Sequence, residues 1–199
     1  MSNEPKAGER YVVREKLLKF FGNAFHIYGE GGRLIGYCKQ KAFRLREDVT
    51  IYTDESRREA LVRMQARQVI DWAVTYDVTL PTGESLGSIR RKGMKSMLRD
   101  SWIVSDMGGR EIATISEDSG GAAILRRFLP LYDFVHPAVL HIDRTDTGRR
   151  VATMGARREL FISRVGVAIH EEDAEIDDLI VLAATCLWMM VRAQQRDNG

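Results

Sequence analysis

The residues best suited to bind a charged ligand are concentrated in the middle of the chain. Five cations fall within ten residues: Arg90, Arg91, Lys92, Lys95 and Arg99. Met94, Met97 and Leu98 lie between them. This mixture suits an anionic membrane surface, because each basic residue near such a surface contributes about 1 kcal/mol while apolar side chains can enter the interface. We therefore predict that residues 90–99 bind anionic phospholipid headgroups or an acidic partner.

A solvated loop whose methionine and leucine side chains pack on the protein is the competing interpretation of this segment. A second, weaker basic stripe consists of Lys39, Lys41, Arg44 and Arg46. We interpret the pairs Arg126–Arg127 and Arg157–Arg158 as surface charges. The net charge of the chain is only +2, which does not by itself predict nucleic-acid binding, so a nucleic acid is kept only as a second alternative partner.

Six carboxylates gather near the C-terminus: Glu171, Glu172, Asp173, Glu175, Asp177 and Asp178. Calcium requires six to eight oxygen ligands arranged around a turn, and the spacing of an EF-hand loop is missing here. We interpret this segment as a solvated linker that ends by capping a helix, since Asp177 and Asp178 stand where a helix N-terminus favours anions.

No group of residues predicts catalysis. Four histidines lack zinc-ligand spacing: His26, His136, His141 and His170. The two cysteines, Cys38 and Cys186, lie in apolar surroundings and are predicted to be buried thiols, which are poor nucleophiles. No Gly-x-Ser-x-Gly turn is present, and Trp72, Trp102 and Trp188 are predicted core aromatics. We therefore predict a protein that is not an enzyme and uses no cofactor or metal.

The element that must position all of these residues is a C-terminal helix over 176–196. Between Leu179 and Val191 Thr185 is the only polar side chain, so the helix is apolar on every side and must be surrounded. The apolar run of about 13 residues spans roughly 20 Å, short of the roughly 20 residues that a bilayer requires. We predict a helix buried in protein and no transmembrane span, with these central residues: Leu179, Leu182, Leu187, Trp188 and Met190.

About a dozen strands precede this helix, because apolar and polar residues alternate with a period of two between short turn segments. A short helix is expected over 121–129, before Pro130. The strands are predicted over residues 11–17, 25–28, 34–42, 48–53, 62–67, 74–80, 86–92, 101–106, 111–117, 138–144, 150–155 and 161–169.

A seven-residue pattern recurs four times, beginning at Gly32, Gly83, Gly109 and Gly148. Each copy has a turn glycine, two mostly polar residues, an aliphatic residue, Gly or Ala, a Ser, Thr or Tyr, and an apolar residue. The first glycine supplies the positive φ of a hairpin turn. The small residue at the fifth position is expected to leave room for the helix beside the sheet. A dozen such strands can close into a barrel wide enough to hold the helix, which also removes exposed strand edges.

Three segments resemble the LURP-one-related family: residues 32–45, 91–102 and 177–183. That family belongs with the phospholipid scramblases and the tubby C-terminal domain, and the likeness extends over about residues 10–195. The resemblance implies a mainly β fold, a closed antiparallel barrel of about twelve strands around a hydrophobic C-terminal helix. Tubby domains bind phosphoinositides and scramblases are associated with calcium-dependent lipid movement, so the resemblance implies a binding module for phospholipid.

The sequence thus predicts a disordered tail over 1–9 and a single domain over 10–196. The first residues contain no apolar stretch typical of a secretion signal, which favours a cytoplasmic protein, peripheral at the membrane where it binds lipid. The alternative function is a scramblase-like membrane protein that inserts its last helix.

Overall fold

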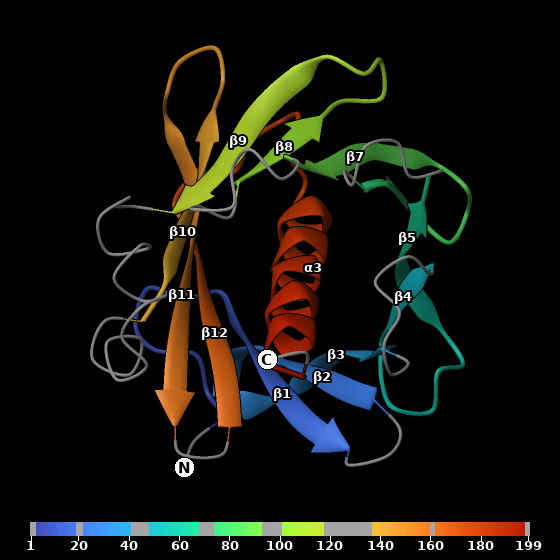
Figure 1. The fold of residues 1–199 in the computed structure, drawn as a ribbon, viewed down its shortest axis with the longest axis vertical. Coiled ribbons are helices and arrows are strands. Elements are labelled where there is room, and N and C mark those ends of the chain that lie inside the picture. The colour runs from blue at the N-terminus through green and yellow to red at the C-terminus, as the bar shows by residue number, and fades with distance from the viewer. Residues whose placement is uncertain are drawn as a thin grey trace.

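The described parts of this computed structural model, residues 3–18, 22–40, 48–67, 74–92, 101–117, 137–159 and 162–197, form a closed antiparallel barrel around one helix. The predicted fold class is therefore confirmed (Figure 1). The strands are β1 Tyr11–Leu18, β2 Gly22–Tyr28, β3 Leu34–Gln40, β4 Val49–Tyr52, β5 Ala60–Ala66, β6 Thr75–Thr79, β7 Ser85–Arg91, β8 Ser101–Ser105, β9 Glu111–Glu117, β10 Val139–Arg144, β11 Arg150–Glu159 and β12 Ile162–Ile169. The helix is α3 Asp178–Asp197, and a single 3-10 turn, η1 Glu30–Gly32, joins β2 to β3. The predicted helix over 121–129 lies outside the described residues.

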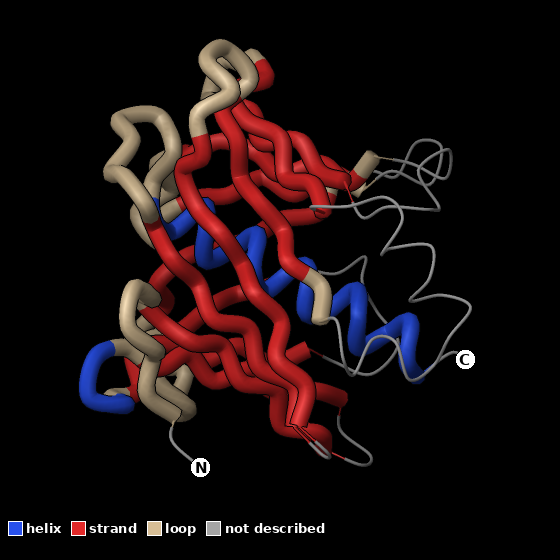
Figure 2. The backbone as a smooth tube through the Cα atoms, turned by 90° about the vertical axis from the view of Figure 1, so that its left-hand side faces the viewer, coloured by secondary structure: helices blue, strands red, loops and turns tan. Residues whose placement is uncertain are grey.

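Each strand pairs with the strands before and after it in the chain, and β12 closes the barrel on β1. Successive strands therefore run in opposite directions, and the barrel has two different ends. At the end that we call the turn end, short described hairpins join the strands and α3 begins. At the opposite end, which we call the far end, α3 finishes (Figure 2).

The recurring seven-residue pattern builds a β-bulge next to each turn. The four turn glycines have φ values of +66° to +91°, which confirms the predicted turn chemistry. In each hairpin the register shifts by one residue immediately after the turn, because one strand contributes an extra residue. That extra residue is the aliphatic one of the pattern: Ile35, Leu86, Ile112 and Val151.

The expectation that the small residue after the bulge makes room for the helix is wrong at both glycines. A Cβ added at Gly36 would lie 2.7 Å from the Ile27 side chain on β2. At Gly87, where φ is +128°, it would collide with the carbonyl oxygen of Ser105 on β8. The small residue admits the neighbouring strand, which bends toward it at the bulge.

Helix α3 fills the barrel as the all-round apolar pattern predicts. Leu182, Leu187, Trp188 and Met190 are each at most 5% exposed, and Leu179 is half-buried at the entry of the helix. Thr185, the one polar residue in the apolar run, donates its hydroxyl to the carbonyl of Val181 at 2.8 Å. None of the described helices combines the length and hydropathy needed to cross a bilayer.

The helix should be the main source of stability. We expect Leu187→Ala to lower the free energy of unfolding by about 2–5 kcal/mol, because Leu187 is fully buried and its removal leaves a cavity between helix and sheet. Gln195→Ala, at an exposed position of the last helical turn, is the matched control and should change it by less than about 0.5 kcal/mol. Urea denaturation measures both, and equal effects would contradict the enclosed helix.

Candidate anionic-ligand site

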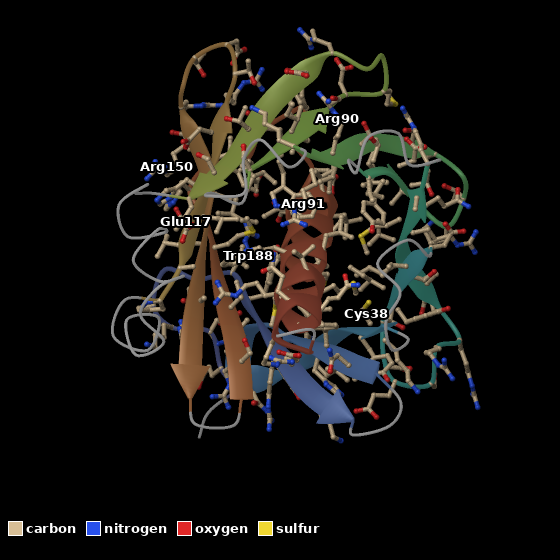
Figure 3. The ribbon with its side chains drawn as sticks, in the orientation of Figure 1. Cys38, Arg90, Arg91, Glu117, Arg150 and Trp188 are labelled. Carbon is tan, nitrogen blue, oxygen red and sulfur yellow. The ribbon has the colours of Figure 1, made fainter. Side chains whose placement is uncertain are left out.

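The end of β7 places three of the five predicted basic residues at the far end of the barrel. Consecutive strand residues point to opposite faces, so Arg90 faces outward while Arg91 shares the inner face with the buried Ile89 (Figure 3). Lys92 follows directly, is exposed, and donates its backbone N–H to the carbonyl of Ser101 at 2.9 Å. The three cations therefore lie at one place on the rim of the barrel, one on its outer face, one on its inner face and one at the edge.

Arg90 has one nearby carboxylate. Its Nη2 atom lies 3.0 Å from Oε1 of Glu111, at the start of β9. Both side chains are nearly half exposed, and an ion pair in that environment contributes less than about 1 kcal/mol. An anionic ligand can therefore replace Glu111 at little cost.

Arg91 is held against aromatic side chains. Its guanidinium carbon lies 5.8 Å from the ring centre of Trp102, the residue opposite it on β8, a distance suited to a cation–π contact. Burial raises the pKa of Tyr76 to about 12, and the nearby Arg91 charge opposes part of that rise. The contact with Trp102 fixes the direction of the Arg91 side chain.

The end of α3 adds two further arginines at the far end. The Arg192 guanidinium lies 5.3 Å from the ring centre of Trp188, repeating the arginine–tryptophan arrangement of Arg91. Arg196 forms two hydrogen bonds, of 2.7 and 3.1 Å, to the carboxylate of Glu15, which is buried on β1. The predicted central helix and the predicted basic segment thus reach the same end of the molecule.

The remaining predicted basic residues are only partly described. Lys39 is exposed on β3. Arg157 pairs with Glu9, so it is more than a solvated surface charge. The following lie outside the described residues, or their side chains do: Lys41, Arg44, Arg46, Lys95, Arg99, Arg126, Arg127 and Arg158.

The carboxylates of the acidic segment over 171–178 form ion pairs with arginines at the turn end. Asp173, whose side chain is 2% exposed, receives Arg144 Nη1 at 2.8 Å and Arg149 Nη2 at 3.0 Å. Glu175 pairs with Arg144 and with Arg110. Asp177 caps the helix as predicted, since its Oδ1 accepts the backbone N–H of Leu179 at 2.7 Å. This network fastens the linker across the turn end of the barrel, where α3 enters.

The network also determines the protonation of its carboxylates. Burial raises the pKa of Asp173, but the backbone N–H of Glu175, the Arg144 guanidinium and the N–H of Ile176 outweigh it, so that the pKa is lowered overall. The pKa of Glu175 is likewise lowered, mainly by its hydrogen bond to Arg144. Both side chains are therefore held as carboxylates by the cations that the hairpins supply.

Three arginines of this network were not predicted as functional: Arg110, Arg144 and Arg149. A signal for two of them was present in the sequence, because an arginine follows the turn glycine in the copies beginning at Gly109 and Gly148. Arginine at the turn faces the helix entry, where the acidic linker must cross. The pairing itself depends on the barrel closing and so is invisible in the linear sequence.

The histidines and cysteines of the described part offer no nucleophile or metal centre. Among the described residues no cluster of His, Cys, Asp or Glu has the arrangement of a metal site. Burial raises the pKa of the Cys186 thiol to about 12 and that of Cys38 well above its ordinary value, so both stay protonated. His26 contacts Glu55 at 2.7 Å, and Thr153 lies between His141 at 3.2 Å and His170 at 2.8 Å. His136 lies outside the described residues.

The architecture defines a class of protein, a closed twelve-stranded barrel enclosing its own C-terminal helix. Residues 34–130 match the family model described as LURP-one-related, a region that begins with β3 and includes the basic end of β7. The predicted resemblance to the LURP-one-related family is therefore confirmed over residues 34–130, and the grouping with tubby-like and scramblase-like proteins is consistent with the match. No curated protein sequence matches the chain significantly. The family supports a binding-type domain rather than a catalyst.

The acidic linker predicts a pH dependence of stability. Asp173→Asn keeps an oxygen that can accept the backbone N–H groups but removes the charge facing Arg144 and Arg149. We therefore expect it to lower the free energy of unfolding by about 2 kcal/mol at pH 7. The lowered pKa of Asp173 stabilises the fold above the unfolded value of about 3.9, and this contribution is lost as the pH falls through the folded pKa.

The difference in the free energy of unfolding between wild type and Asp173→Asn should therefore become smaller below about pH 4. Urea denaturation at several pH values measures it. Glu172→Gln serves as the control, because Glu172 is 89% exposed and lies 3.7 Å from Arg10. A difference that stays constant down to pH 3 would rule out the charge as its cause.

Proposed function

We propose that this protein is a non-catalytic module that binds anionic phospholipid headgroups at the far end of the barrel. The observation that carries the proposal is the position of Arg90, Arg91 and Lys92 on one strand end, on the outside, the inside and the rim of the barrel. A phosphate group placed at this rim can be approached by guanidinium donors from two directions. Guanidinium groups and ammonium groups are the side chains that proteins use most for phosphate.

The contrast between the two barrel ends supports this assignment. At the turn end Arg110, Arg144 and Arg149 each contact more than one carboxylate, and the linker crosses over them. At the end of β7, Arg90 contacts the half-exposed Glu111. Arg90 and Lys92 are exposed at the far end, where an external anion can reach them.

The enclosed helix argues against the scramblase-like alternative in which α3 enters the membrane. Leu187 and Trp188 are almost completely buried among the strands. Inserting the helix would expose the apolar inner face of the whole barrel to water, at a cost that grows with the area exposed. The proposed module binds lipid from the surface with the helix in place.

Vesicle co-sedimentation tests the proposal. Wild type should bind vesicles in which about one lipid in five is phosphatidylserine and the rest is phosphatidylcholine. It should not bind vesicles of phosphatidylcholine alone. The double variant Arg90→Gln, Lys92→Gln should bind about 25-fold more weakly, since each basic residue contributes about 1 kcal/mol near an anionic surface. Arg91 is left intact because its contact with Trp102 also supports packing.

The matched control is Arg33→Gln, Arg58→Gln, which removes two exposed cations from the turn end. Equal loss of binding in both double variants would show a general charge effect and overturn the site. Binding of a 20-base-pair DNA duplex with no binding of vesicles would favour the nucleic-acid alternative. Retention of an acidic peptide with no binding of vesicles would assign the same surface to a protein partner.

A further inference from the structure

Three arginines form a continuous row on the outside of the barrel, away from the proposed lipid site. Arg14 on β1 is paired in register with Arg164 on β12, which is paired with Arg157 on β11. Their neighbours Val13 and Val165 face the core, so the three arginines all face outward. Adjacent strands lie about 5 Å apart, which places three positively charged side chains next to one another.

Two glycines form the floor beside this row. Gly155 on β11 is paired with Gly166 on β12, two residues along from Arg157 and Arg164 on the same outer face. A Cβ at Gly155 would meet nothing within 4 Å, so the space above it is open. The two glycines leave two positions of the sheet without side chains beside Arg157 and Arg164, and an anion can approach the backbone closely there.

The carboxylate of Glu9 already occupies this place. Any side chain at Gly166 would overlap the Glu9 carboxylate, and Glu9 forms an ion pair with Arg157. The Arg157 and Glu9 side chains are 22% and 17% exposed, so the pair is mostly shielded from water. Arg164 is only 3% exposed although it faces outward. The contact thus has the chemistry of an anion-binding site filled by the chain itself.

The segment that carries Glu9 contacts the barrel through Asn3 and Glu9, and the backbone N–H of the next residue, Arg10, donates to the carbonyl of Val167 at 2.7 Å. Asn3 accepts a hydrogen bond from Arg14 Nη1 at 3.2 Å and rests against Gly32 beside η1 (Figure 2). The backbone N–H of Lys6 donates to the second Glu9 carboxylate oxygen at 2.9 Å. Lys6, Ala7 and Gly8 are exposed. Solvent, and with it an external anion, therefore reaches the segment directly beside Glu9.

We propose that the row Arg14–Arg164–Arg157 and its glycine floor form a second binding site, specific for a phosphate group and closed in the free protein by Glu9. A phosphate monoester brings up to two charges and three acceptor oxygens, whereas Glu9 brings one charge and two oxygens. It can therefore bridge more than one guanidinium of the row and compete with the tethered carboxylate. Binding of phosphate releases residues 3–9 from the barrel surface.

Titration calorimetry with inorganic pyrophosphate tests the site in the full chain. Glu9→Gln should bind pyrophosphate about tenfold more tightly than wild type, because the internal anion no longer competes. Glu84→Gln, at the exposed turn between β6 and β7, raises the net charge equally and should leave the affinity unchanged. Adding Arg157→Gln to Glu9→Gln should abolish the gain. An equal gain in Glu9→Gln and Glu84→Gln, or no gain in either, would overturn the proposal.

Limited trypsin digestion of the wild type gives a readout that needs no variant. Pyrophosphate should accelerate cleavage after Lys6 several-fold and leave cleavage after the exposed Arg58 unchanged. An unchanged rate after Lys6 at saturating pyrophosphate would show that Glu9 is a fixed structural contact. Arg90→Gln, Lys92→Gln should retain the response to pyrophosphate, so failure of the lipid site and failure of this site are separate results.

Discussion

The constraint on which the structure depends is that helix α3 has no side suited to water. Its residues between Leu182 and Met190 are apolar apart from Thr185, and they are buried all round by the strands. An open sheet would cover one side of such a helix only, so the sheet must close. Closure then requires every strand to pair with a strand on each side, and the bulge beside each recurring turn helps the sheet to bend.

Threading a helix through a barrel makes the two ends chemically different. The helix begins at the turn end, where its N-terminus favours carboxylates, and the acidic linker there is fastened by arginines from the hairpins. The helix finishes at the far end, where its C-terminus favours cations, and Arg192 and Arg196 lie there with the basic end of β7. The polarity of one element thus places an acidic linker at one end of the barrel and arginines of the helix at the other.

The outer face of the barrel bears arginines and glycines that take no part in the core. Because the core determines the inward positions, the outward positions of β1, β12 and β11 can hold arginines and glycines. Their arrangement around Glu9 couples the N-terminal segment to a charged surface. The segment predicted from composition to be a tail contacts the barrel at Asn3 and Glu9, although few of its own atoms are buried.

The sequence by itself determined the barrel, its enclosed helix and nearly all strand positions, because period-two alternation and an all-round apolar helix are local patterns set by water. It also located Arg90, Arg91 and Lys92, since their clustering is local. It did not reveal why positions 36 and 87 require glycine, because the atoms that a side chain would meet there belong to neighbouring strands. Only the tertiary structure decided that Arg144 meets Asp173 and that Arg14, Arg164 and Arg157 form a row, since closure alone fixes which distant residues share a register.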